Sequence, residues 1–301
     1  FSGILPPLSQ DRWQEYFSLY KQIPEYKKIN YGMSLDDFKF IFWWEYIHRV
    51  LARLLVMIYF FPLIYFIIKK KIPSNEIKYH LFVFLLFLSQ GFMGWYMVKS
   101  GLISETDVSH VRLAAHLSLA IIIYSLIFWS LLNLGGQFSF RLTKNSFLIF
   151  LLIVFLIIQI IWGAFTSGLN AGMLYQTWPL MNGQFIADDV SLFNILSSES
   201  INNPSYVQVL HRLFAYFIVF YIMVIYFFHF KKEKIFKPFG FIFFAIIIQV
   251  ILGIVTLISG LNIYVASSHQ MGSIFLISCA IYGLFYVKNN QNLIDRPIDK
   301  Q

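Results

Sequence analysis

The sequence predicts an all-α protein that crosses a membrane several times, on the evidence of its composition and its apolar stretches. Of the 301 residues, 58% are hydrophobic and 13% are charged, whereas a soluble domain carries about 25% charged residues. This shortage of charge excludes a water-soluble domain, a disordered chain and a nucleic-acid-binding protein, despite a formal net charge of +8. The single cysteine, Cys279, excludes an internal disulfide and a cysteine-based metal pair.

Seven stretches reach the length of about 20 mostly apolar residues that a membrane-spanning helix needs. They lie near residues 41–68, 80–98, 111–134, 147–169, 207–230, 236–261 and 267–287. Residues 1–40 mix prolines and charges with aromatic residues, so we expect an ordered segment outside the bilayer. The long loop 170–206 is polar and contains no Lys or Arg.

Basic residues predict the orientation of these spans, because loops on the cytoplasmic side carry an excess of Lys and Arg. Thirteen lie after the first, third and fifth spans or in the tail 288–301, and six lie on the opposite side. The tail is therefore predicted to be cytoplasmic, and the leader 1–40 and the loop 170–206 are predicted to lie outside.

An internal repeat predicts two bundles of four helices related by pseudosymmetry. A Gln-x3-Gly pattern occurs in the second, fourth and sixth spans, and a His-Arg pair opens the first and fifth. The fourth span has no counterpart in the first half, so we expect a further helix before Phe1 and eight in total. The predicted domains are an N-terminal bundle at 41–134 and a C-terminal bundle at 147–287. The repeated patterns are Gln90-x3-Gly94, Gln159-x3-Gly163, Gln249-x3-Gly253, His48-Arg49 and His211-Arg212.

Four histidines fall near the outer ends of alternate spans, two in each half: His48, His116, His211 and His269. Ionisable residues inside a bilayer are costly and indicate function. Two imidazoles that converge inside a helix bundle are typical of bis-histidine heme ligation. Zinc is less favoured because no third or fourth ligand accompanies each pair. The glycines on neighbouring spans suit either a large flat ligand or close packing of helices.

Three charged residues accompany the histidines. Arg49 and Arg212 could pair with heme propionates, or extend to lipid headgroups. Glu45 stands three residues before His48, where the second half has Gln208. It could move protons for a substrate, or form an ion pair with Arg49 one helical turn away. The sequence assigns no role to His110.

Several of these motifs together resemble the heme A synthase family, in its proteobacterial and mitochondrial branch. The resemblance rests on the run from Trp43 to Arg49, the segment from Arg112 to Leu117, the pairs His211-Arg212 and His269-Gln270, and the leader from Gly3 to Leu8. It covers nearly the whole chain. Another branch of that family carries a cysteine pair in its first outer loop, and this leader has none.

The resemblance implies an enzyme that oxidises a methyl group of heme O to the formyl group of heme A by successive hydroxylations, for cytochrome c oxidase assembly. It further implies that His211 and His269 ligate a resident heme b. His48 and His116 would hold the substrate heme, with Glu45 as the catalytic carboxylate. Heme O synthase and oxidase assembly factors would be partners, while the electron partner and any homo-oligomer are left open.

Two other functions are compatible with the residues. One is a diheme b-type electron carrier without chemistry on the heme, which the placement of all four histidines on the outer side disfavours. The other is a transporter, which the lack of acids or bases at mid-depth disfavours. The expected location is a bacterial inner membrane rather than a mitochondrial one.

Overall fold

The computed structural model describes residues 5–101, 106–134, 143–194, 197, 200–230 and 236–289. Within these residues the secondary structure is helical and contains no strand ladder, so the all-α prediction is confirmed. The predicted tail beyond Asn289 lies outside the described residues, as do several of the basic residues counted above. Two short helices, α1 (Gln10–Tyr20) and α2 (Pro24–Lys28), occupy the leader.

The predicted spans are confirmed: seven of the described helices are long and apolar enough to cross a membrane, which makes this a multi-pass membrane protein. The predicted eighth helix stays a prediction. The seven are α3 (Leu35–Ile68), α4 (Ser74–Gly101), α5 (His110–Leu132), α6 (Lys144–Gly168), α7 (Pro204–Ile225, continued by a π-helical turn, Tyr226–Phe230), α8 (Phe236–Ile258) and α9 (Ile263–Asn289).

Contacts between residues divide the chain into two units, Phe1–Arg112 and Leu113–Gln301. Most of α5 therefore groups with the helices that follow it. Its Tyr124 hydroxyl forms a 2.7 Å hydrogen bond with Oγ of Ser278 on α9. The division into bundles at 41–134 and 147–287 stays a prediction.

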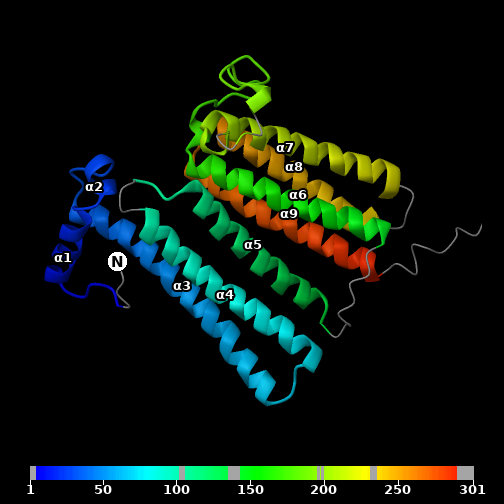
Figure 1. Ribbon diagram of the computed structural model, residues 1–301, viewed down its shortest axis with the longest axis horizontal. Helices are drawn as coiled ribbons and strands as arrows, with labels where there is room; N and C mark the ends of the chain where they lie inside the picture. Colours follow the sequence, from blue (N-terminus) through cyan, green and yellow to red (C-terminus); the bar gives the residue numbers. More distant parts are fainter. Residues whose placement is uncertain are drawn as a thin grey trace, which may run out of the picture. The chain divides into compact units, whose positions relative to one another are not determined.

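In the first unit, α3 and α4 run alongside each other, and α1 packs on the N-terminal part of α3 (Figure 1). Helix α3 begins at Leu35, before the apolar stretch, because Ser34 and Asp37 form a capping box. The Ser34 hydroxyl accepts the Asp37 N–H at 3.2 Å, and the Asp37 carboxylate accepts the Ser34 N–H at 3.1 Å. The leader is joined to α3 by an aromatic cluster of Trp13, Phe17, Tyr20, Tyr26, Phe38 and Phe42.

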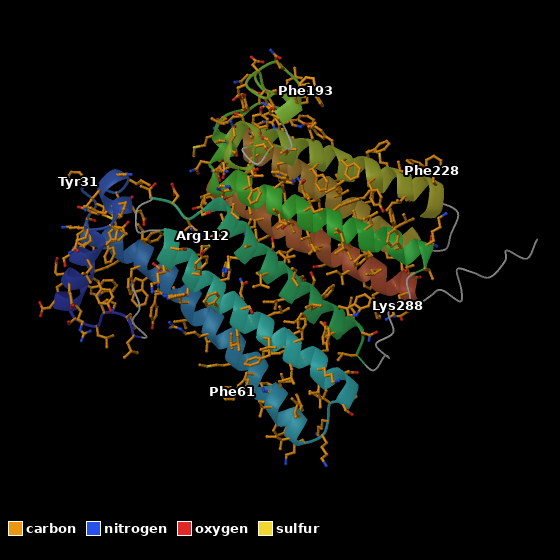
Figure 2. The ribbon with its side chains drawn as sticks, viewed as in Figure 1. Tyr31, Phe61, Arg112, Phe193, Phe228 and Lys288 are labelled. Carbon is orange, nitrogen blue, oxygen red and sulfur yellow. The ribbon has the colours of Figure 1, made fainter. Side chains whose placement is uncertain are left out.

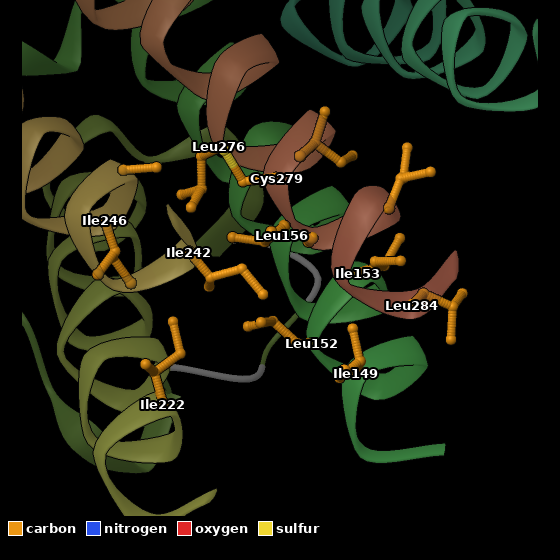
Figure 3. Close-up of a cluster of buried hydrophobic side chains, with 14 of the residues drawn as sticks. Ile149, Leu152, Ile153, Leu156, Ile222, Ile242, Ile246, Leu276, Cys279 and Leu284 are labelled. Atoms are coloured by element: carbon orange, nitrogen blue, oxygen red, sulfur yellow. The ribbon is translucent and has the colours of Figure 1, made fainter. Parts of the chain in front are cut away.

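In the second unit, α6, α7, α8 and α9 form a four-helix bundle (Figure 1). Helix α6 packs on both α7 and α9, and α8 packs closely on α9 and loosely on α7. Helices α7 and α9 therefore lie on a diagonal of the bundle. Apolar side chains of α6, α8 and α9, such as Leu152, Ile242 and Leu276, converge in its core (Figure 3).

A Ser-Gly-Leu sequence follows the Gln-x3-Gly pattern on α6 and on α8, and each helix ends there. After α8, Gly260 and Leu261 adopt positive φ values of 67° and 62°, a conformation in which only glycine is free of a steric penalty. The Leu261 N–H then donates back to the carbonyl of Thr256 at 3.0 Å, as in a helix C-cap. Helix α6 likewise ends at Gly168.

Candidate functional site

His211 and His269 lie at matching depth on the two diagonal helices of the bundle. His211 is the eighth residue of α7 and His269 the seventh of α9, so each lies about 10 Å from the start of its helix. Both helices start at the same end of the unit (Figure 1). The two histidines that the sequence paired therefore lie in one bundle, at matching depth on its diagonal helices.

Each imidazole rests against a glycine of a neighbouring helix. A Cβ on Gly163 of α6 would lie 3.3 Å from Cε1 of His211, and a Cβ on Gly253 of α8 would lie 2.9 Å from Cε1 of His269. Carbon atoms prefer separations of about 3.5–4.0 Å, so any side chain at either position would displace the ring. The sequence left the role of these glycines open, and the structure shows that they make room for the histidines.

A glutamine one turn before each glycine binds the histidine backbone. Nε2 of Gln159 donates to the carbonyl of His211 at 3.0 Å, and Nε2 of Gln249 donates to the carbonyl of His269 at 2.9 Å. On α6 and α8, the Gln-x3-Gly pattern therefore positions one histidine each: the glutamine binds its main chain, and the glycine makes room for its ring.

The donor set around these histidines fits a heme. Two imidazoles come from opposite sides of an apolar bundle, which is the arrangement of bis-histidine ligation. Among the described residues, no group of three or more His, Cys, Asp or Glu could hold a metal ion by itself. Structural zinc needs four protein ligands and catalytic zinc three, so the pair suits a porphyrin-bound iron better than a bare metal ion.

Arg212 anchors the loop that precedes α7. Its guanidinium donates to the carbonyls of Thr177 at 3.0 Å and Tyr175 at 2.7 Å. Gln208, one turn earlier, donates to the same Tyr175 carbonyl at 3.0 Å. A guanidinium has five N–H groups, so these two hydrogen bonds leave donors for a further acceptor. The predicted pairing of Arg212 with a propionate stays a prediction.

Asp189 fastens the same loop to the start of α7. Its carboxylate accepts hydrogen bonds from the Tyr175 hydroxyl at 2.6 Å and from Oγ of Ser205 at 2.5 Å. Burial by itself would raise the pKa of Asp189, but the hydrogen bonds from Ser205 and Tyr175 outweigh it and hold that pKa below its ordinary value. The bond to Asp189 raises the pKa of Tyr175. Farther along the loop, Phe193 stands away from the helices (Figure 2).

In the first unit, Glu45 forms an ion pair with Arg49 on the next turn of α3. This is one of the two arrangements that the sequence allowed for Glu45. His48, between them, is exposed within its unit. His116 lies on α5, in the second unit, so its predicted pairing with His48 stays a prediction.

Glu25 of α2 is a further carboxylate close to Glu45, and sequence reasoning did not identify it. It accepts a hydrogen bond from the Tyr20 hydroxyl at 3.1 Å. Its pKa is raised, chiefly by burial and further by the nearby charges of Glu45 and Asp107. No local motif marks Glu25, because the fold of the leader brings it to this position.

The whole chain matches known proteins. A family described as cytochrome oxidase assembly protein matches residues 1–281. A protein of Pelagibacter ubique named heme A synthase is 48% identical over 291 residues, which cover 96% of this chain and 86% of that protein. The chain belongs to the heme A synthase family. Relatives with the same name in Rickettsia bellii and in Wolbachia pipientis are 41% and 40% identical, each over 96% of this chain.

Membership of the heme A synthase family confirms the resemblance drawn from the sequence motifs. The family assignment rests on nearly the whole chain, whereas the roles of single residues depend on the geometry described above. That geometry supports His211 and His269 as a pair most directly, because both lie in one unit.

Proposed function

We propose that this protein converts heme O to heme A, by successive hydroxylations that turn one methyl group of the porphyrin into a formyl group. As a member of the heme A synthase family, it is an enzyme and an oxidoreductase. The observation that best supports the proposal is the histidine pair of the second unit, with each ring seated on a glycine and each backbone carbonyl held by a glutamine.

His211 and His269 are the proposed axial ligands of a resident heme b. A heme bound there would supply one-electron transfer. The chain contributes two imidazoles at one depth, glycines that let the rings lie close to α6 and α8, and an apolar core beneath them. Arg212 directly follows His211 and is the proposed partner of a propionate of such a heme.

His48 and His116 are the proposed ligands of the substrate heme. The support is the internal repeat, in which they stand where His211 and His269 stand in the second half. Glu45 is the proposed catalytic carboxylate: it takes up protons released from the methyl group as it is oxidised. Arg49 pairs with Glu45 one helical turn away and so helps to hold the carboxylate in place on α3.

The proposed setting is a bacterial inner membrane, since the relatives named above are bacterial. Heme O would arrive from heme O synthase, and heme A would pass to factors that assemble cytochrome c oxidase. The oxidation also releases electrons, which an electron partner would have to accept.

Pigment analysis of the purified full-length protein tests the proposal. The expected result is a low-spin heme b in the redox difference spectrum, with heme O or heme A among the extracted pigments. Heme b alone under every condition would instead support a diheme electron carrier. A colourless protein after expression with ample heme would refute both functions and favour a transporter.

A further inference from the structure

Gly272 of α9, three residues after His269, lies where the side chain of Gln249 meets that helix. A Cβ built on Gly272 would overlap Oε1 of Gln249, and it would lie 3.2 Å from Cδ1 of Leu252 and 3.5 Å from Cδ of Gln249. The same carboxamide donates from Nε2 to the carbonyl of His269 at 2.9 Å. One carboxamide of α8 therefore meets α9 at two points, at His269 and at Gly272.

Gly272 makes room for a side chain of α8 rather than for its backbone. The three atoms nearest to the built Cβ all belong to side chains of α8, and two of them belong to Gln249. Glycines that permit close packing of helices let two backbones approach, whereas here a carboxamide fills the space. Leu252 contributes only the end of a flexible side chain, which can turn away. Gln249 is therefore the residue that excludes a larger side chain at this position.

The orientation of the carboxamide is fixed by its bond to His269. A carbonyl accepts hydrogen bonds and does not donate them, so the nitrogen of the carboxamide must face it and the oxygen must point elsewhere. That oxygen lies at Gly272, buried and without a hydrogen-bond partner among the residues that the structure describes. Turning the carboxamide to relieve an overlap at Gly272 would carry Nε2 away from the carbonyl. The bond to His269 therefore depends on a glycine at position 272.

The same bond sets the position of the His269 ring. The carbonyl of a helical residue already accepts the N–H of the residue four positions later, and Gln249 uses the second lone pair of that oxygen. Gly253, one turn further along α8, is the glycine against which the ring rests. Gln249 thus ties the main chain of His269 to α8 one turn away from the place that receives its ring.

We propose that Gly272 is a positioning residue for His269: it provides the space in which the Gln249 carboxamide can hold the main chain of this proposed heme ligand. The inference rests on the proposed binding of heme b by His211 and His269. It concerns one half of the site, because the residue three positions after His211 is Phe214. This difference also explains why the repeat in the sequence did not mark Gly272.

A double-mutant cycle in the full-length protein tests whether Gly272 acts through Gln249. Gln249→Ala removes one hydrogen bond and should release heme b about 5-fold faster than the wild-type protein does. Gly272→Ala breaks the same bond by displacing the carboxamide, so we expect release to be about 5- to 10-fold faster. Added to Gln249→Ala, it should change the release rate by less than about 2-fold, because the carboxamide is already gone.

The EPR signal of the ferric heme separates positioning from a general effect on packing. In a bis-histidine heme this signal depends on the mutual orientation of the two imidazole planes. Gly272→Ala and Gln249→Ala should shift it in the same direction, since both free the main chain of His269. Gly240→Ala is the control, because nothing lies within 4 Å of a Cβ built there. It should leave the signal and the release rate unchanged.

A wild-type protein that binds no heme b would refute the proposed function, and the inference with it. If the wild-type protein binds heme b, additive losses in the double variant would overturn the inference while the function stands, because Gly272 would then act independently of Gln249. A wild-type EPR signal in Gly272→Ala would overturn it as well. Should Gly272→Ala fail to fold, a folded double variant supports the coupling and an unfolded one refutes it.

Discussion

Replacing Gly253 with alanine tests whether the glycines of the bundle exist to seat the histidine rings. The new Cβ would lie 2.9 Å from Cε1, 3.4 Å from Nδ1 and 3.6 Å from Nε2 of His269. Since carbon atoms settle at about 3.5–4.0 Å, the ring must withdraw by roughly 0.6 Å or more from its present place. At Gly163 the corresponding approach is 3.3 Å, so alanine there demands a smaller shift.

The free-energy cost of these alanine substitutions should appear in heme binding rather than in folding. An unligated imidazole can turn away from the methyl group, whereas a ring bound to iron is held in place. Overpacking typically costs about 1–3 kcal/mol, which corresponds to about a 5- to 150-fold loss of affinity. We expect Gly253→Ala to fall in the upper part of that range and Gly163→Ala in the lower part.

The assay is the ratio of heme b to protein after purification, followed by the rate at which heme leaves the protein. Gly240→Ala, on the same helix, is the control because nothing lies within 4 Å of a Cβ built there. It should keep its heme and stabilise α8 slightly, since alanine favours a helix over glycine. Full heme occupancy and a wild-type release rate in Gly253→Ala would refute the reasoning, as would equal loss in Gly240→Ala.

Three further predictions concern the histidines, Glu45 and the outer loop. His211→Ala and His269→Ala should each abolish the low-spin heme b spectrum, because a single imidazole cannot complete the axial pair. Glu45→Gln should keep the heme b spectrum but stop heme A from accumulating in chromatograms of extracted pigments. Because the pKa of Asp189 is lowered in the folded protein, its carboxylate stabilises the loop above the unfolded pKa of about 4. That stabilisation is lost as the pH falls through the lower folded pKa, and limited proteolysis should then cut the loop faster.

Each of these predictions has its own control. A retained low-spin spectrum in either alanine variant would remove that histidine from the ligand set. Normal heme A formation in Glu45→Gln would remove Glu45 from the chemistry. For the loop, Tyr175→Phe lacks the hydroxyl that bonds to Asp189 and should increase proteolysis at neutral pH. A proteolysis rate independent of pH between 6 and 3 in the wild-type protein would contradict the role of Asp189.

Much of the fold could be predicted because a membrane leaves few options for an apolar chain. A stretch of about 20 apolar residues in lipid must be helical to satisfy its own backbone, so the apolar stretches located the seven spans found among the described residues. The ends of the helices were less predictable. Helix α3 begins before its apolar stretch because of the capping box at Ser34. Capping residues lie in polar segments, so a search for apolar stretches does not find them.

The site could be predicted only where it repeats. The repeat marked His211, His269 and their Gln-x3-Gly partners, because a pattern at equal spacing in three spans has few other causes. It could not reveal what the glycines do, since a glycine that seats a ring and one that permits helix packing are identical in sequence. A Cβ added at Gly163 or Gly253 would lie 3.3 or 2.9 Å from Cε1 of the neighbouring imidazole, which supports the seating of a ring at these two glycines.

Hydrogen bonds to backbone carbonyls could not be predicted from the sequence. Arg212 donates to the backbone carbonyls of Thr177 and Tyr175. Every residue has such a carbonyl, so the residue type does not identify the acceptor. Glu25 was missed for a related reason: it approaches Glu45 through the aromatic packing of the leader, which joins residues far apart in the chain. Long-range contacts of this kind depend on the completed fold.

The difference between the halves of the repeat can be traced to one position. Gln208 and Glu45 each stand three residues before a histidine, and an arginine follows each histidine directly. In the second half, Gln208 and Arg212 both donate to the Tyr175 carbonyl and anchor the loop that precedes α7. An ionised carboxylate has no proton to donate to a carbonyl, so Glu45 cannot hold a loop in that way and pairs with Arg49 instead. The exchange of an amide for an acid thus converts a structural anchor into a group that can accept a proton. Such a group is what the proposed oxidation of a heme methyl group in the first half would need.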